Sequence, residues 1–362
     1  MSPAATEAFI GLMSGTSLDG VDAVLAEVSM AGLVVRAHAH RVFSAELRAE
    51  LLALNQAGSD ELHRSARAGQ ALARLYADAV LDLGPLPSVR AVGAHGQTVR
   101  HRPELGYTCQ LLDAALLAEL TGLDVVADLR SRDVAAGGQG APLVPAFHRA
   151  VFGQPGVDVA VLNLGGMGNL SLLHADGRTT GFDTGPANAL LDAWVARHRG
   201  QPFDANGAWA AQGQVLPELL AAMQAEPYFA LPPPRSTGRD LFDAPWLLRQ
   251  PLAGAAPEDV QATLAELTAW SVTEALRSHQ PQVREVIVCG GGAFNGDLLG
   301  RLAKRLPGVG FVSSADRGLP PMQVEAAAFA WLAHRFVHHL PGNLPAVTGA
   351  RGPRVLGALY PA

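Results

Sequence analysis

Cysteine, charge and long apolar runs are all scarce in this 362-residue sequence. Its two cysteines, Cys109 and Cys289, lie in or beside apolar segments without CxxC or cysteine–histidine spacing. This pattern argues against a disulfide scaffold and a cysteine metal centre, and we expect both thiols to be reduced core residues. No apolar run approaches the ~18 residues of a membrane span, and no signal-peptide pattern opens the chain. We therefore expect a cytoplasmic protein without a membrane partner.

Basic clusters are missing as well. The chain has 27 Lys+Arg against 33 Asp+Glu, for a net charge of -6, which argues against a nucleic-acid partner. Hydrophobic residues make up 49% and charged residues 17%, as in an ordinary globular protein. A chain of this length can form two domains, each with its own core.

Three glycine-rich turns follow predicted strands at separated points of the chain. The segment from Phe9 to Leu25, FIGLMSGTSLDGVDAVL, predicts a strand, a tight turn and a second strand. The segment from Asp158 to Leu173, DVAVLNLGGMGNLSLL, has the same pattern, and EVIVCGGGAFNG, from Glu285 to Gly296, leads from a strand into a helix. We expect an α/β chain that holds a ligand between two similar halves.

The first of these turns has the components of an anion site. Its tip, SGTS, offers hydroxyls and backbone N–H groups. It lacks the lysine of the P-loop pattern, and on its own an ordinary hairpin turn is the simpler interpretation. Asp19 and Asp22 flank the turn, and either carboxylate could hold Mg²⁺ through a water molecule.

A polar cluster follows the strand predicted over 89–94, where ligand-facing loops usually lie in α/β sheets. His95, Gln97 and Thr98 of this cluster could hydrogen-bond a polar substrate. Arg130 and Arg132 follow another predicted strand, beside two aspartates. They form either a surface ion-pair cluster or an arginine fork for a phosphoryl group or sugar hydroxyls.

Asp183 is the candidate general base. It lies in GFDTGP, where a strand is expected to turn into a helix whose N-terminus would keep the carboxylate ionised. A plain N-cap is the alternative role for an aspartate in that position. Glu325 opens a predicted helix, where an acid needs no catalytic function to explain it.

The segment from Ala135 to Pro145, AAGGQGAPLVP, is rich in glycine and proline and free of charge. Such a composition is typical of a crossing between domains. We expect an N-terminal domain over 1–135 and a C-terminal domain over 136–340, with the tail over 341–362 returning to the first domain.

The ordered set of motifs resembles the anhydro-N-acetylmuramic acid kinase family of the sugar kinase/Hsp70/actin superfamily. The resemblance runs from Phe9 to about Leu356. It rests on MSGTSLDGVD, AHGQT, RDVAAGGQGAPLVP, LNLGGMGN, FDTGPAN, STGRD, CGGGAFN, EAAAFAWLA and NLPAVTGA. It implies two ribonuclease-H-like, actin-like ATPase domains around a cleft, a homodimer, and ATP with Mg²⁺ as cofactors. The implied reaction converts 1,6-anhydro-N-acetylmuramic acid, ATP and water to N-acetylmuramic acid 6-phosphate and ADP, in peptidoglycan recycling.

The resemblance also implies roles for individual residues. Asp183, Arg130 and Glu325 match catalytic positions, and with them Ser14, His95, Gln97 and Thr98 match the sugar site. The positions implied for the nucleotide are Gly15, Thr16, Ser17, Leu18, Asp19, Gly20, Val21, Asp22, Gly165, Gly166, Asn169, Gly290, Gly291, Gly292 and Asn295. The sequence departs from the family pattern at Ala187, Arg235, Phe294 and Met322.

Three other functions fit parts of this pattern. One is a nucleotide-driven switch of the Hsp70 or actin kind, which would hydrolyse ATP without a sugar. Another is a kinase for N-acetylglucosamine or intact N-acetylmuramic acid. The third, a catalytically dead sugar-binding relative, is disfavoured by the intact Asp183.

Overall fold

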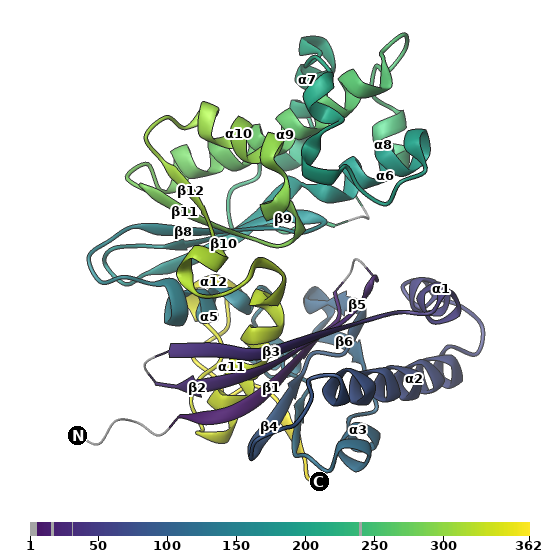
Figure 1. The fold of residues 1–362 in the computed structure, drawn as a ribbon, viewed down its shortest axis with the longest axis vertical. Coiled ribbons are helices and arrows are strands. Elements are labelled where there is room, and N and C mark those ends of the chain that lie inside the picture. The colour runs from purple at the N-terminus through teal and green to yellow at the C-terminus, as the bar shows by residue number, and fades with distance from the viewer. Residues whose placement is uncertain (1–5, 16–17, 31, 239–240) are drawn as a thin grey trace. The chain divides into compact units, whose positions relative to one another are not determined.

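The computed structural model describes residues 6–15, 18–30, 32–238 and 241–362. The chain forms two compact α/β units, Met1–Val151 with Gln323–Ala362, and Phe152–Met322 (Figure 1). The expected α/β class is confirmed. Thr16 and Ser17 of the first turn lie outside the described residues.

The first unit is built on a six-stranded sheet of order β13-β7-β4-β1-β2-β3. Strands β1, β2 and β3 form an antiparallel meander, β4 and β7 continue parallel to β1, and β13 pairs antiparallel with β7. A separate hairpin, β5-β6, follows β4. The strands are β1 (Glu7–Met13), β2 (Gly20–Ser29), β3 (Gly32–Val42), β4 (Val89–Ala94), β5 (Gln97–Arg102), β6 (Tyr107–Leu111), β7 (Val125–Ala127) and β13 (Ala358–Tyr360). The helices are α1 (Ala45–Ala53), α2 (Glu61–Leu81), α3 (Ala114–Thr121), α4 (Ser131–Ala135), α5 (Val144–Phe152), α11 (Val324–Val337) and α12 (Pro345–Thr348).

The second unit repeats this topology. Its five-stranded sheet has the order β10-β9-β8-β11-β12, again an antiparallel meander of three strands followed by parallel neighbours. The strands are β8 (Val159–Leu164), β9 (Met167–Leu173), β10 (Thr179–Pro186), β11 (Glu285–Cys289) and β12 (Gly310–Ser313). The helices are α6 (Asn188–Arg199), α7 (Pro217–Gln224), α8 (Ala244–Leu248), α9 (Pro257–His279) and α10 (Gly296–Arg305). The two glycine-rich hairpins therefore hold the same place in their sheets.

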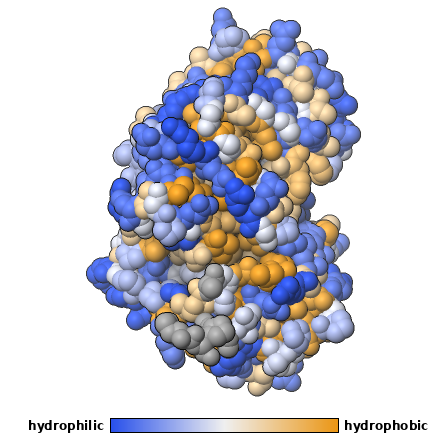
Figure 2. Space-filling model, turned by 60° about the vertical axis from the view of Figure 1, so that its left-hand side comes forward, coloured by the Kyte–Doolittle hydropathy of each residue, from blue (hydrophilic) through white to orange (hydrophobic). Residues whose placement is uncertain are grey.

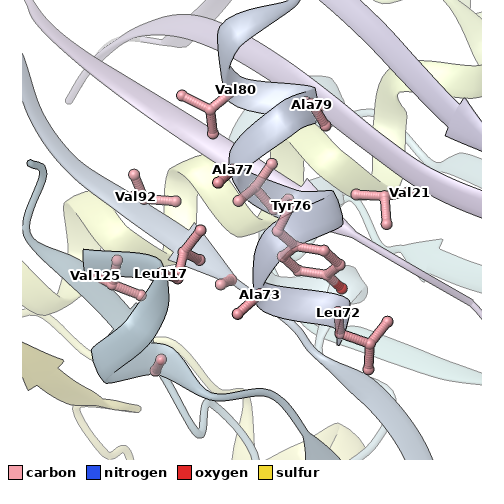
Figure 3. Packing of buried hydrophobic residues seen from close by; sticks show 14 of the residues in the cluster. Val21, Leu72, Ala73, Tyr76, Ala77, Ala79, Val80, Val92, Leu117 and Val125 are labelled. Carbon is pink, nitrogen blue, oxygen red and sulfur yellow. The ribbon is translucent and has the colours of Figure 1, made fainter. Parts of the chain in front are cut away.

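Successive side chains of the strands in the first unit point to opposite faces of the sheet, and this divides the core into two layers. Ile10 and Leu12 join the apolar cluster formed by α2 and α3, whereas Phe9 points to the opposite face and meets His334 of α11. Figure 3 shows Tyr76 of α2 among the side chains of this cluster. In the second unit, α9 and α10 cover β8, β9 and β11, and a further cluster joins α9 to α6, α7 and α8.

Two glycines allow α11 to approach the first sheet at backbone contact. A Cβ on Gly11 would lie 1.9 Å from the carbonyl oxygen of Ala326, and one on Gly93 would lie 2.1 Å from that of Phe329. Any larger residue would push the helix away from β1 and β4. Because Glu325 lies in the first turn of α11, this contact also sets its position.

The unit boundaries differ from the expected ones. The glycine-rich stretch before Pro145 lies inside the first unit, because the buried Asp133 accepts from the Gly140 amide at 2.8 Å and from Thr348 at 2.8 Å. The first crossing instead follows Val151, and α11 belongs to the first unit through its packing on β1. Composition alone did not reveal that the loop is anchored.

The two cysteines have different environments. Cys289 is buried in β11 as expected, but Cys109 is exposed on β6, so the prediction of a core position is wrong for Cys109. The hairpin that carries Cys109 leaves that side of the strand uncovered.

On the face drawn in Figure 2, hydrophobic residues are interspersed with hydrophilic ones. None of the described helices combines the length and apolar character that crossing a membrane requires.

We predict that Gly93→Ala will lower the free energy of unfolding by about 1–3 kcal/mol, because the added methyl group overpacks the backbone contact with α11. Urea denaturation measures the change. Gly300→Ala in α10 is the control: its Cβ would meet nothing within 4 Å, so helix propensity should make it neutral or stabilising. Equal effects of the two variants would contradict the contact.

Candidate functional site

Arg130 and His95 form the centre of a polar network in the first unit. Asp128, with φ 53, turns the chain after β7, and Arg130 follows at the N-cap of α4. The Arg130 guanidinium donates to His95 Nε2 from Nε at 3.0 Å and to the Gly140 carbonyl from Nη1 at 2.9 Å. His95 Nδ1 in turn donates to the Ser14 carbonyl at 3.1 Å, which fixes the neutral tautomer.

Burial shifts the pKa values of both groups. It lowers the pKa of His95 to about 3, and the adjacent Arg130 charge adds to the shift. Burial also lowers the pKa of Arg130 to about 10, so the guanidinium remains charged at neutral pH. A neutral acceptor therefore holds a partly buried cation. Among the described residues no ion pair joins Arg130 or Arg132 to Asp128 or Asp133, which contradicts the surface ion-pair cluster considered for these arginines.

A buried tyrosine that sequence reasoning missed fixes the end of β1. The Tyr76 hydroxyl contacts Ser14 Oγ at 2.8 Å, and Ser14 Oγ donates to the Gly96 carbonyl at 3.2 Å. Ser14 and Tyr76 are fully buried, so this pair positions the loop after β1 from inside the unit. Figure 3 shows the Tyr76 ring on α2. Helical spacing indicated that Tyr76 is buried but not what its hydroxyl binds.

Gln97 and Thr98 have different environments. Gln97 Nε2 donates to the Gly15 carbonyl at 3.1 Å, while its buried Oε1 has no hydrogen-bond partner in the described part of the chain. Thr98 Oγ1 accepts from Gln110 at 3.1 Å within the β5-β6 hairpin. Gln97 thus contacts the loop after β1, whereas the Thr98 hydroxyl contacts Gln110 within the β5-β6 hairpin.

Acidic groups surround the start of α11. Burial raises the pKa of Glu325, and Asp22 and Asp19 raise it further, against the opposing charge of Arg130. Asp22 Oδ1 also lies 3.0 Å from His38 Nε2 on β3. These shifts place Glu325 within electrostatic reach of Arg130 and of both aspartates proposed for the first turn. Leu18 of that turn has a φ of 55 and is buried.

Asp183 occupies a strand instead of the expected strand-to-helix turn. It lies within β10, and α6 begins later with Ala187 as its N-cap, so the N-cap interpretation is wrong. The Asp183 Oδ2 accepts from the Thr237 amide at 3.0 Å. Burial raises the pKa of Asp183 to about 6, while the Thr237 amide and the Arg235 charge oppose the shift. The expected helix N-terminus contributes none of these effects.

A second interaction that the sequence did not reveal holds the strand that carries Asp183. Tyr228 donates to the Asp183 carbonyl at 2.7 Å, and Arg235 Nη1 donates to the Phe229 carbonyl at 2.9 Å and to that of Leu231 at 2.8 Å. The Arg235 guanidinium also lies 5.5 Å from the Phe182 ring centre and 5.2 Å from that of Tyr228. Arg235, noted in the sequence only as a departure, binds this loop to β10.

The register of strands β8, β9 and β10 places two asparagines beside Asp183. Asn163 of β8 pairs with Asn169 of β9, and Asn169 pairs with Asp183 of β10. Directly paired residues point to the same face of a sheet, so the three polar side chains form a row across it. Asn169 was expected at the nucleotide; Asn163 was not singled out and is recognisable only from register.

The glycines of the second unit fall into two groups. A Cβ on Gly290 would lie 2.4 Å from Asn163 Oδ1, and one on Gly292 would lie 2.5 Å from Leu164 Cβ, so packing requires both glycines. A Cβ on Gly165 would lie 3.7 Å from its nearest atom, and one on Gly166 would lie 3.8 Å from its nearest atom. Neither glycine has a positive φ. Neither packing nor backbone conformation within the described residues therefore explains Gly165 and Gly166. Gly291 is equally open, with 3.8 Å to its nearest atom.

Asn295 has a structural contact of its own. Its Oδ1 accepts from the Leu298 amide at 3.0 Å and caps α10. Phe294, where the resemblance expects histidine, is 60% exposed beside it.

We predict that Asp183 titrates near pH 6 in the folded protein, measured by carbon-13 NMR of the carboxyl groups with Asp183→Asn for assignment. Because the folded pKa exceeds the ordinary aspartate value of 3.8, protonation of this group stabilises the fold below that value. That contribution is lost as the pH rises through about 6. Arg235→Met should raise the pKa further, and Arg235→Lys should raise it less. An Asp183 pKa near the ordinary value in the wild type would contradict the burial argument.

The comparisons with known proteins agree over almost the entire chain. Residues 7–362 match the family model described as Anhydro-N-acetylmuramic acid kinase. The chain is 59% identical to the anhydro-N-acetylmuramic acid kinase of Variovorax paradoxus strain S110, over 99% of this chain and 100% of that protein. It is 60% identical to that of Bordetella petrii, over 98% of this chain and 96% of that protein. The chain therefore belongs to the anhydro-N-acetylmuramic acid kinase family.

Proposed function

We propose that this chain is an ATP-dependent kinase that opens 1,6-anhydro-N-acetylmuramic acid with water and phosphorylates it to N-acetylmuramic acid 6-phosphate, in peptidoglycan recycling. The observation that carries the proposal is the partly buried Asp183, with its pKa raised to about 6 and its carboxylate held by one backbone amide. Family membership supplies the substrate.

Asp183 is proposed as the general base. A pKa near 6 leaves the carboxylate ionised at neutral pH and more basic than an exposed aspartate, which suits proton abstraction from water. In this reaction the water oxygen bonds to the anomeric carbon, Asp183 takes its proton, and the bond from that carbon to the bridging oxygen breaks. The freed oxygen at position 6 receives the phosphoryl group. The Thr237 hydroxyl, buried without a partner among the described residues, is available to hydrogen-bond the water or the sugar.

Arg130 and Glu325 are proposed to act at the sugar and the transferred phosphoryl group. His95 Nε2 accepts hydrogen bonds from two nitrogens of the Arg130 guanidinium, Nε at 3.0 Å and Nη2 at 2.9 Å. A fixed cation stabilises developing negative charge without reorganising. Ser14 is assigned to positioning the loop after β1 because its side chain is fully buried; Gln97 Oε1 is a free acceptor for a substrate hydroxyl.

ATP and Mg²⁺ are the proposed cofactors. When bound, ATP supplies the phosphoryl group, and Mg²⁺ accompanies its phosphates, with Asp19 as the proposed neighbouring carboxylate. The fit to this chain is the open space beside Gly165 and Gly166, which a side chain at either position would fill. Gly15 to Asp22, Asn169, Gly290 to Gly292 and Asn295 remain proposed nucleotide positions.

The reaction is tested by mass spectrometry of incubations with ATP, Mg²⁺ and 1,6-anhydro-N-acetylmuramic acid. Intact N-acetylmuramic acid and N-acetylglucosamine serve as parallel substrates. The proposal requires a product heavier by one phosphate and one water, from the anhydro sugar. Phosphorylation of an intact sugar in its place, or ATP consumption without any sugar product, would overturn it.

Asp183→Asn should abolish turnover while ATP affinity stays within about threefold, because the amide cannot accept the proton of water. In the wild type, kcat/KM should fall as the pH drops below about 6, since protonation removes the base. Steady-state kinetics and ATP titration calorimetry measure the two effects. Residual turnover above about a hundredth of wild type would exclude Asp183 as the base.

Gly165→Ala should weaken ATP binding at least about tenfold without lowering the melting temperature, because its Cβ fills space that the fold leaves open and blocks close approach of a phosphate. Calorimetry and thermal melts separate the two quantities. Gly290→Ala is the matched contrast and should destabilise the fold, since its φ is 77 and its Cβ would overlap Asn163. Unchanged ATP affinity in Gly165→Ala would remove this turn from the nucleotide site.

We also propose that the protein works in the cytoplasm, where ATP is available, and that it forms a homodimer, as the family resemblance suggests. Sedimentation equilibrium at micromolar concentration tests the second statement, and a monomer mass would contradict it.

A further inference from the structure

Two histidines and a glutamate of the first unit lie together at the end of α11. His334 and His338 are separated by one helical turn, and Glu7 opens β1 alongside them. One ligand atom from each of the three lies within 4.8 Å of those of the other two. The His334 and His338 rings are 4.5 Å apart between centres. Neither the resemblance nor the proposed kinase activity uses these residues.

We propose that Glu7, His334 and His338 bind a divalent transition metal, with Zn²⁺ as the best match. Two imidazoles four residues apart on one helix face, with a carboxylate from a neighbouring strand, form a ligand set that Zn²⁺ accepts. Three protein ligands leave a fourth position for water. Mg²⁺ and Ca²⁺ prefer oxygen donors, so the magnesium of the proposed kinase reaction does not compete well for this set.

The environment of His334 is a second observation in favour of a ligand. His334 is 4% exposed, and its Nδ1 has no hydrogen-bond partner among the residues that the structure describes. Leaving a buried polar nitrogen unpaired costs free energy, which a bound metal and its water would offset. The ring of Phe9 packs edge-on against His334 at 5.5 Å between centres, which fixes the imidazole orientation.

The other two ligands are accessible from solvent. The side chains of His338 and Glu7 are 42% and 29% exposed, and an open hollow beside Glu7 is lined by Glu27 and Arg90. His338 Nε2 and Glu7 Oε2 share a hydrogen bond in the metal-free arrangement. On binding, the metal replaces this hydrogen bond: the neutral His338 imidazole would bind it through Nε2 while carrying its proton on Nδ1, and Glu7 would bind it through the carboxylate.

The location suggests a structural function for the metal. Glu7 begins β1, whereas Ser14, in the loop next to the proposed sugar site, follows the opposite end of this strand. At ~3.3 Å per residue, Glu7 and Ser14 lie roughly 20 Å apart. His334 and His338 likewise lie at the opposite end of α11 from Glu325. The metal would clamp β1 to α11, the strand and helix that meet at Gly11, without touching the proposed catalytic residues. The proposal therefore stands independently of the kinase activity.

The test is Zn²⁺ titration of chelator-treated full-length protein, by calorimetry and thermal melting, without nucleotide or sugar. We expect one Zn²⁺ per chain and a melting temperature raised by about 3 °C or more at saturation. Co²⁺ serves as a spectroscopic probe, and visible absorption of a four- or five-coordinate complex with nitrogen ligands is expected.

Glu7→Gln and His338→Asn should each weaken Zn²⁺ binding by at least about tenfold and reduce the Co²⁺ absorption. Both side chains are partly exposed, so these variants should fold. His339→Asn, at the adjacent exposed histidine, is the matched control and should bind like the wild type. No saturable Zn²⁺ binding, or binding that both ligand variants leave unchanged, would overturn the proposal.

Discussion

The backbone contact between α11 and the first sheet is the constraint on which much of this unit depends. Gly11 and Gly93 have no side chains to separate the helix from β1 and β4. The helix consequently lies at a fixed height over the sheet, with Glu325 at one end and the histidine pair at the other. One steric requirement thus positions both a proposed catalytic carboxylate and the proposed metal ligands.

The two units hold their charged groups in opposite ways. In the first, the partly buried Arg130 donates to a histidine that burial and the arginine keep neutral, and the charges of Glu325 and Asp133 act on it without an ion-pair contact among the described residues. In the second, a carboxylate is buried beside a single amide and the Arg235 charge, and its pKa rises. In both arrangements burial shifts the pKa of an ionisable group away from its ordinary value, which is typical of functional sites.

Sequence reasoning was strongest where glycine spacing and strand patterns coincide. It located both glycine-rich hairpins, β1-β2 and β8-β9, and the strand before Gly290, because a β-branched run that ends in glycines strongly favours a strand followed by a turn. It misplaced Asp183 at a strand-to-helix turn, whereas the residue lies within β10, and it placed the domain crossing before Pro145, where the buried Asp133 anchors a loop that resembles a linker. Those errors share a cause, since a contact with a residue from another segment of the chain decides each outcome: Asp183 pairs with Asn169 of β9, and Asp133 accepts from Thr348.

The sequence by itself determined the α/β class, the pair of similar halves and the candidates for the chemically active residues, because these follow from local periodicity and residue type. Only the tertiary structure decided that Tyr76 holds Ser14, that Arg235 secures the strand of Asp183, and that Glu7 meets His334 and His338. Long-range packing creates these contacts, and packing also sets the burial that shifts the pKa values of Asp183 and His95. Local pattern carries no information about either.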